Sequence, residues 1–348
     1  MNINTIADII LDETSSPKEL RDAVDAFALL CSQITSIRPD PSFDAWAHDS
    51  FLENGVAINP QAAALCALDY QRSVVFIRGI YAAIKTLRLR FPGTRLEILY
   101  AGCGPFATLL LPLLDRVSSG DIELSLLDFH QQSLDSVKLL LTHFGLCNHA
   151  IKFIKADACK YNHARKLHLI IVEAMQKSLE QEPQFAITAN LAPQLISAGI
   201  FIPERIDVSL YLADLEHEQK LINQSEISGA NELKKIARRY LLARVCNLNP
   251  GQAFGDMRRT QTHSVAIGPE LAPIIVTIPR AAKFAQSDAA LFTRIRVFEQ
   301  YGLKDYESQI TLPLKCYDLV PLTGGDRYEV SYQLGRYPRF NFRRLKNE

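Results

Sequence analysis

Two glutamates, Glu173 and Glu182, stand nine residues apart just after a buried strand predicted at 167–172. If the segment between them folds back, the two carboxylates face each other. Such a pair suits a guanidinium, a planar cation whose N–H donors form a fork that carboxylates accept in pairs. A plainer interpretation is also open, in which Glu180 and Glu182 are solvated loop charges and Glu173 caps a helix.

A glycine-bearing turn is the second candidate site. Gly102 and Gly104 follow a buried apolar run and remove side chains where the backbone turns and a ligand can come close. Pro105 is expected to open a helix over 105–114. Asp128 ends the next predicted strand, where a carboxylate can accept both hydroxyls of a ribose. The pattern indicates a nucleotide-like cofactor, and NAD and S-adenosylmethionine both fit it.

The composition points to a small-molecule partner. The 348 residues carry 38 basic and 38 acidic side chains, so no excess charge recruits nucleic acid or a membrane surface. Seven cysteines lack C-x-x-C spacing, which predicts reduced thiols and no metal site. Neither a secretion signal nor an apolar run long enough for a membrane span is present in the sequence. We therefore expect a cytoplasmic location.

Three regions are expected. Residues 1–90 show helical patterns, residues 91–202 alternate strands with helices, and residues 203–348 show strand-type alternation. The middle region predicts a mostly parallel, Rossmann-like α/β sheet, and the last region predicts a mostly antiparallel, β-barrel-like domain. A helical excursion over 215–237 interrupts it. The expected strands are 96–101, 122–127, 151–154, 167–172, 199–202, 206–212, 240–246, 274–278, 291–298, 310–315 and 328–332, with a helix over 131–144.

Capping residues and a cluster of arginines predict local structure in the first and last regions of the chain. Ser16 and Glu19 form a capping box before one helix, and Asn59 begins a second helix that ends near Leu89. The polar segment between these helices is expected to be a loop or a lid. The arginines of 336–344 predict a solvated basic end or, alternatively, a wall for a substrate carboxylate.

The order of these features resembles the catalytic core of the protein arginine methyltransferases over roughly residues 65–215. Glu173, Met175 and Glu182 match the double-glutamate loop of that family in type and spacing. Upstream, the Asp69-Tyr-Gln-Arg72 sequence is similar to the family's helical motif, whose arginine holds the methionine carboxylate of S-adenosylmethionine. The resemblance favours S-adenosylmethionine over NAD.

The resemblance implies a residue for each task. Glu173 and Glu182 would be catalytic and would bind the substrate together with Met175, for which both a pocket-wall role and core packing are open. The cofactor would be held by Arg72, Gly102, Gly104, Asp128, Asp157 and Ala158. Asp157 would lie near the adenine edge, and an N-cap role remains open for it. The resemblance also implies a homodimer, in which the helical excursion packs on the partner.

Three departures from the family's sequence pattern narrow the range of expected substrates. Tyr100 stands where the family has an acidic residue, Phe106 replaces its third glycine, and no threonine-histidine-tryptophan loop occurs in the last region. We expect N-methylation of free arginine or a small guanidino compound, with peptidyl arginine as the alternative substrate. A methyltransferase fold that only binds its ligand, and an NAD-dependent oxidoreductase, are the other open hypotheses.

Overall fold

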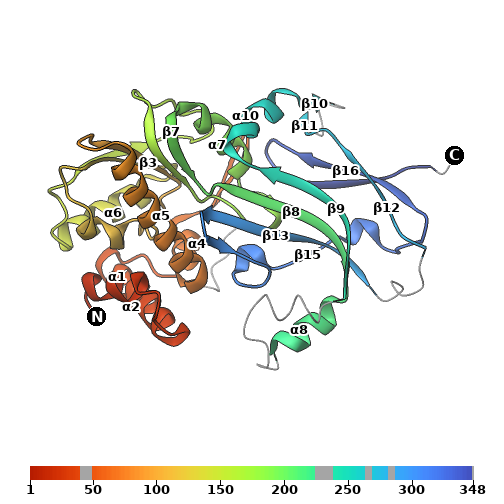
Figure 1. The fold of residues 1–348 in the computed structure, drawn as a ribbon, viewed down its shortest axis with the longest axis horizontal. Helices are drawn as coiled ribbons and strands as arrows, with labels where there is room; N and C mark the ends of the chain where they lie inside the picture. Colours follow the sequence, from red (N-terminus) through yellow and green to blue (C-terminus); the bar gives the residue numbers. More distant parts are fainter. Residues whose placement is uncertain (40–48, 224–237, 263–268, 281–286, 347–348) are drawn as a thin grey trace.

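The computed structural model describes residues 1–39, 49–223, 238–262, 269–280 and 287–346. Its centre is a five-stranded sheet in the order β5-β4-β3-β6-β7, in which every pairing is parallel (Figure 1). This confirms the Rossmann-like prediction. The strands are β3 Leu96–Ala101, β4 Ile122–Asp128, β5 Ala150–Lys155, β6 Leu167–Val172 and β7 Leu195–Ile202.

Helices cover both faces of this sheet. All six residues of β3 are buried, which explains its apolar sequence apart from Glu97, whose carboxylate is paired with Arg165. Ile98 packs in the cluster that holds α5 (Tyr70–Arg90) and α6 (Gln131–His143), whereas Leu99 packs with α7 (Gln184–Leu191) on the other face. The helix predicted over 131–144 is thereby confirmed.

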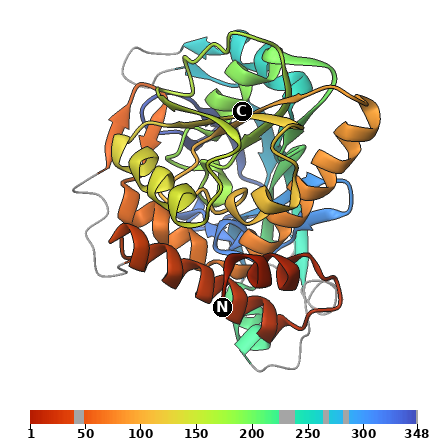
Figure 2. The ribbon, with the colours of Figure 1, turned by 90° about the vertical axis from the view of Figure 1, so that its left-hand side faces the viewer.

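The N-terminal region is helical, with one break that the sequence pattern did not predict. Helices α1 (Ile3–Leu11) and α2 (Pro17–Thr35) pack together at one side of the molecule (Figure 2), and the capping box of α2 is present. The single helix expected from Asn59 to Leu89 is wrong. The segment instead forms α4 (Pro60–Leu65), the 3₁₀ helix η1 (Cys66–Leu68) and α5, because Asp69 caps a new helix.

The expected loop or lid before Asn59 contains a short antiparallel hairpin. Its strands are β1 (Ser50–Leu52) and β2 (Gly55–Ala57). Residues 40–48, which make up much of the expected lid, lie outside the described part of the chain.

The helix expected over 105–114 does not form. A series of turns follows Gly104 and leads into the 3₁₀ helix η2 (Leu111–Arg116). Ala107 has a φ of 44°, which is not helical, and Pro112 has no N–H to continue an α-helix through the segment. The glycine turn is therefore followed by irregular backbone and not by the N-terminus of an α-helix.

The C-terminal region is built from two five-stranded antiparallel sheets, as predicted for a barrel-like domain (Figure 1). Along β13, Leu291, Ile295 and Val297 join the main core and Phe292 packs on the opposite side, as strand alternation predicts. A register shift between Arg296 and Phe298 ends this alternation, because Phe298 also packs in the main core. The strands are β8 Arg205–Ala213, β9 Arg239–Leu248, β10 Gln261–Thr262, β11 Pro269–Glu270, β12 Ile274–Thr277, β13 Asp288–Phe298, β14 Tyr301–Leu303, β15 Leu314–Lys315, β16 Arg327–Gln333 and β17 Arg339–Arg344.

Two predictions for this region are corrected. The strand expected over 310–315 is the 3₁₀ helix η6 (Gln309–Thr311) followed by the two-residue β15. The basic end is not simply a solvated tail, because β17 pairs with β16 and buries Phe340. The remaining 3₁₀ helices are η3 Lys177–Leu179, η4 Ala192–Gln194 and η7 Tyr317–Leu319.

The helical excursion begins where it was expected. Helix α8 (Leu215–Asn223) projects from the C-terminal sheets (Figure 1), and residues 224–237 lie outside the described part of the chain. Helix α10 (Pro250–Arg258) was not predicted. Among the described helices, none has the length and apolar character that crossing a membrane requires.

Asp69 connects helix α5 with the C-terminal region of the chain. Its carboxylate caps α5 through the Arg72 N–H and accepts hydrogen bonds from the Ser308 hydroxyl (2.6 Å) and the Gln309 N–H (2.9 Å). Asp69→Ala should lower the free energy of unfolding by about 1–3 kcal/mol, because three donors lose their acceptor. Urea unfolding measures this. In the control Asp135→Ala, an exposed carboxylate of α6 is lost. Equal stability losses in the two variants would contradict the assignment.

Candidate functional site

A cavity lies at the carboxyl edge of the parallel sheet, where open α/β sheets bind ligands. It is lined by both apolar and charged side chains, as ligand sites commonly are. The β1–β2 hairpin, α4, α5, the ends of β3, β4 and β6, and the loop after β6 all contribute to its lining. The predicted site residues that line it are Arg72, Gly102, Gly104, Asp128, Asp157, Ala158, Glu173 and Glu182.

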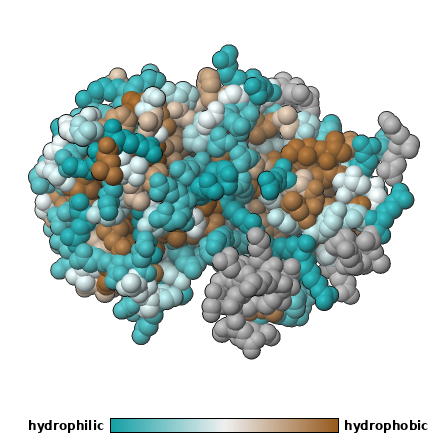
Figure 3. Space-filling model, in the orientation of Figure 1, coloured by the Kyte–Doolittle hydropathy of each residue, from teal (hydrophilic) through white to brown (hydrophobic). Residues whose placement is uncertain are grey.

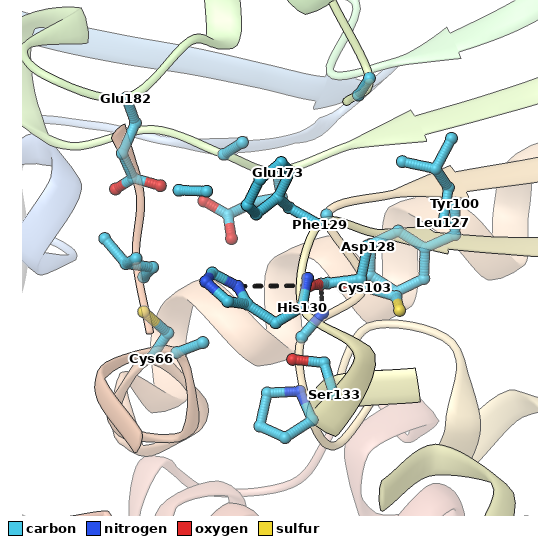
Figure 4. Close-up of a pocket in the computed structure, with 18 of the residues that line it drawn as sticks. Cys66, Tyr100, Cys103, Leu127, Asp128, Phe129, His130, Ser133, Glu173 and Glu182 are labelled. Atoms are coloured by element: carbon cyan, nitrogen blue, oxygen red, sulfur yellow. Dashed lines mark hydrogen bonds and ion pairs between the residues drawn. The ribbon is translucent and has the colours of Figure 1, made fainter. Parts of the chain in front are cut away.

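Glu173 and Glu182 direct their carboxylates into this one cavity (Figure 4). Glu173 forms an ion pair with Arg72, and only 9% and 8% of these two side chains is exposed. One carboxylate oxygen, Glu173 Oε1, is buried and has no hydrogen-bond partner in the described structure. Buried acceptors are normally satisfied, so this oxygen offers a place for an N–H donor from a ligand.

The site favours a positively charged ligand. Burial and the negative charge of Glu173 raise the pKa of Glu182 to about 8, although the positive charge of Arg72 opposes this shift. Asp49 adds to the negative potential at Glu182. Glu182 is therefore mostly neutral at pH 7, and a cation beside it would favour its ionised form.

The C-terminal domain holds the loop that carries the two glutamates. The Ser178 N–H donates to Thr293 Oγ1 (2.9 Å), and the hydroxyl of Tyr332 donates to the Leu179 carbonyl (2.6 Å). The Gln181 N–H donates to the Pro338 carbonyl (2.8 Å). Ser178, Leu179 and Gln181 have positive φ values of 58°, 58° and 64°, which non-glycine residues rarely adopt. These three contacts support a backbone that would otherwise relax.

Gln184 closes the base of the same loop. Its side-chain oxygen accepts a hydrogen bond from the Ala174 N–H (3.0 Å), and its side-chain nitrogen donates to the Val172 carbonyl (3.4 Å). Gln184 is completely buried, so its amide replaces the backbone pairing that is lost where β6 ends. The sequence analysis missed this residue, because an isolated glutamine carries no signal for such a role.

The glycine turn and Asp128 form one hydrogen-bonded unit. Gly102 and Gly104 have φ values of 74° and 62°, in the region that favours glycine. The Gly104 N–H donates to Asp128 Oδ2 (2.9 Å), and the His130 N–H donates to Asp128 Oδ1 (2.8 Å). A carboxylate has about four acceptor positions, so Asp128 keeps capacity for ligand hydroxyls.

Of two further predicted site residues, Asp157 lines the cavity and Met175 does not. Asp157 lines the cavity, and its Oδ1 also accepts the Cys159 N–H (2.9 Å), so the local turn uses part of its capacity. Met175 is not among the lining residues. It is 2% exposed and packs in the hydrophobic core. The wall role implied for Met175 is thus corrected to core packing.

Several lining residues were missed by the sequence analysis. Cys66 and His130 both lie in the cavity (Figure 4). His130 Nδ1 lies 3.7 Å from Asp128 Oδ1, and His130 Nε2 lies 3.2 Å from the Ser50 hydroxyl of the hairpin. The position of His130 two residues after a strand-end aspartate was the available signal. Nothing in the sequence around Cys66 marks it.

No protein-family model and no curated protein matches the sequence. Among solved structures, the chain is similar to the Trypanosoma brucei PRMT1 enzyme-prozyme complex with AdoHcy, with a TM-score of 0.47, 12% identity, and 81% of this chain and 96% of that chain covered. It is also similar to protein arginine methyltransferase 10 of Arabidopsis thaliana, with a TM-score of 0.47, 11% identity, and coverages of 77% and 86%. At these values neither likeness assigns a function to this chain.

The raised pKa of Glu182 predicts a pH-dependent stability. From its ordinary value of 4.5 up to about 8, the unfolded chain releases the Glu182 proton while the folded chain retains it. The wild type should therefore lose stability relative to Glu182→Gln across this range and level off above it. Urea unfolding from pH 5 to 9 measures the difference. Glu216→Gln, at an exposed carboxylate, is the control. A stability difference between wild type and Glu182→Gln that stays constant with pH would contradict the burial of a neutral Glu182.

Proposed function

We propose that this protein is an S-adenosylmethionine-dependent N-methyltransferase that acts on a guanidino group. The observation that carries the proposal is the convergence of Glu173 and Glu182 on one buried cavity, with an unpartnered oxygen on Glu173. The same cavity contains the glycine turn and Asp128. A cation-binding pair thus adjoins features that suit a nucleoside-containing cofactor.

The lining residues fit that cofactor. Asp128 retains acceptor capacity for ribose hydroxyls, and the glycine turn leaves its backbone open to a ligand. Asp157 and Ala158 would lie beside the adenine. Arg72 would hold the methionine carboxylate while remaining paired with Glu173, since a guanidinium has five donors. When bound, S-adenosylmethionine supplies a methyl group on a positively charged sulfur.

The two glutamates supply orientation and charge. A guanidinium lacks a free lone pair because its three nitrogens share the positive charge. Carboxylates that bind two of these nitrogens draw the charge toward them, leave the third nitrogen more nucleophilic and aim it at the methyl group. The attacking nitrogen must then lose a proton. Glu182 suits this task, because it would be ionised beside the bound guanidinium and a carboxylate within reach of the attacking nitrogen can accept the proton.

We propose a small guanidino compound, such as free arginine, as the acceptor. The neutral overall charge and the arginines of β17 offer no acidic surface for an arginine-rich peptide. Methylation of peptidyl arginine remains the second candidate. A binding-only role, prompted by Tyr100 and Phe106, would show no methyl transfer. NAD-dependent oxidation would leave the glutamate pair without a task.

The proposal also includes a homodimer in the cytoplasm. Helix α8 projects from the C-terminal sheets, and its position matches the start of the expected dimerisation arm. On the face seen in Figure 3, hydrophobic residues gather over the C-terminal sheets, whereas the opposite end is mostly hydrophilic. Exposed apolar side chains on β9 and β12 include Tyr240, Leu241, Ile274 and Ile275. Free cysteines in the described residues support a reducing compartment.

Substitution of the glutamates tests the function. Glu173→Gln and Glu182→Gln should each lower methyl transfer to free arginine by about 100-fold or more, because the amides cannot attract a guanidinium as carboxylates do. Affinity for S-adenosylhomocysteine should change little, whereas Arg72→Ala should weaken it first. Radiolabelled methyl transfer and calorimetric titration measure these effects. A titration with NAD belongs in the same series, and a response to NAD alone would overturn the methyltransferase proposal.

Light scattering tests the dimer. At micromolar concentration the full-length chain should have about twice the mass of one protomer. We expect this because the apolar side chains exposed on β9 and β12 would be stabilised when a partner covers them. A measured mass equal to that of one chain, 39.0 kDa, would reject the dimer.

A further inference from the structure

The β1–β2 hairpin forms one wall of the candidate site. Leu52, Val56 and Ala57 belong to it and line the cavity, and Ile58 continues the wall immediately after the hairpin. These side chains are apolar or small, and they face the same space as the carboxylates of Glu173 and Glu182. The hairpin therefore affects how a ligand reaches the glutamates.

The hairpin tip packs directly on the loop that carries Glu182. The Val56 N–H donates a hydrogen bond to the Gln181 carbonyl (2.8 Å). Gly55 has a φ of 144°, and a Cβ at this position would lie 2.8 Å from the nitrogen of Pro183 and 2.9 Å from the Gln181 oxygen. Such distances leave no room for a side chain. The contact thus depends on glycine at position 55.

Polar contacts fasten the hairpin to the parallel-sheet half of the chain. Glu53 pairs with Lys160, which follows β5, at 2.7 Å. The Ser50 hydroxyl lies 3.2 Å from His130 Nε2, and His130 follows β4. Because these partners come after two neighbouring strands, the hairpin spans the carboxyl edge of the sheet.

Ring contacts fasten the hairpin to the C-terminal region. The rings of Phe51 and Tyr337 lie 6.0 Å apart, and the guanidinium of Arg336 lies 5.6 Å from the centre of each. The hairpin thus has four separate contacts with the rest of the protein: these rings, Gln181, Lys160 and His130.

Cationic side chains lie beside the hairpin, and one of them, Lys160, is balanced by Glu53. Lys160 is paired with Glu53 and Arg336 stacks on Phe51, so both cations stand beside the hairpin. Arg339 lies close enough to Glu180 to lower its pKa, against the larger upward effect of burial. Arg336 and Arg339 would therefore disfavour the other arginines of an arginine-rich peptide and would attract the carboxylate of a free amino acid.

We infer that the hairpin of residues 50–57 determines the size of the acceptor. It covers the Glu182 side of the cavity, so that a free guanidino compound can enter and an arginine within a peptide chain cannot. This inference rests on the proposed function. It assigns acceptor selection to the Gly55 contact and to the cations beside the hairpin.

Two matched glycine substitutions test the inference. Gly55→Ala should push the hairpin away from Gln181 and Pro183. Gly93→Ala is the control, because Gly93 also has a positive φ (72°) but no atom lies within 4 Å of a Cβ built there. The ratio of kcat/KM for a Gly-Arg-Gly peptide to that for free arginine should rise about tenfold or more in Gly55→Ala only. Calorimetric titration of both guanidines in the presence of S-adenosylhomocysteine gives the corresponding binding ratio without turnover.

The outcomes separate the two proposals. If the wild type uses the peptide as well as free arginine, or if the ratio is the same in both variants, the hairpin does not select the acceptor and the methyltransferase proposal stands. If the protein neither binds nor methylates any guanidine, both proposals fail. Should Gly55→Ala not fold, Phe51→Ala, which loosens the contact with Tyr337 and Arg336, is expected to raise the same ratio to a smaller extent. An unchanged ratio in that variant would also overturn the inference.

Discussion

The structure depends on placing two carboxylates in one buried cavity. Burial and, to a lesser extent, the negative charge of Glu173 make ionisation of Glu182 costly, and the raised pKa of Glu182 expresses that cost. Arg72 offsets part of it through its ion pair with Glu173. A second guanidinium bound beside Glu182 would offset the rest of this cost and favour the ionised form of its carboxyl.

Such an arrangement persists only if the loop cannot relax. The loop after β6 has three non-glycine residues with positive φ, and its supports come from β13, β16 and the segment before β17. Arg72, the partner of Glu173, is also connected to the C-terminal region. Asp69 caps the helix that carries Arg72 and accepts a hydrogen bond from Ser308. Both members of the Arg72–Glu173 pair are therefore positioned by contacts between the parallel-sheet region and the C-terminal region.

The sequence predicted those parts of the structure that local pattern determines. Buried strands such as β3 are recognised from their largely apolar sequences, and the position of Asp128 follows from its place at a strand end. The glutamate pair was recognised from residue type and spacing, and both glutamates line the cavity. The prediction of a helix over 105–114 was wrong, because an apolar pattern with helical spacing does not show that Ala107 has a positive φ. Pro112, which lacks an N–H, was the one sign in the sequence against an α-helix. Met175, Gln184 and the hairpin depend on contacts between distant segments, which no local pattern encodes.

The most direct test of the central claim is the proton balance of guanidine binding. Calorimetric titration of free arginine at pH 7, with S-adenosylhomocysteine present and in two buffers of different ionisation enthalpy, counts the protons exchanged. Because the pKa of Glu182 is about 8, its carboxyl should be mostly neutral before binding and ionised beside the guanidinium afterwards. The account predicts release of close to one proton in the wild type and none in Glu182→Gln. Arginine binding without proton release, or no arginine binding at all, would contradict it.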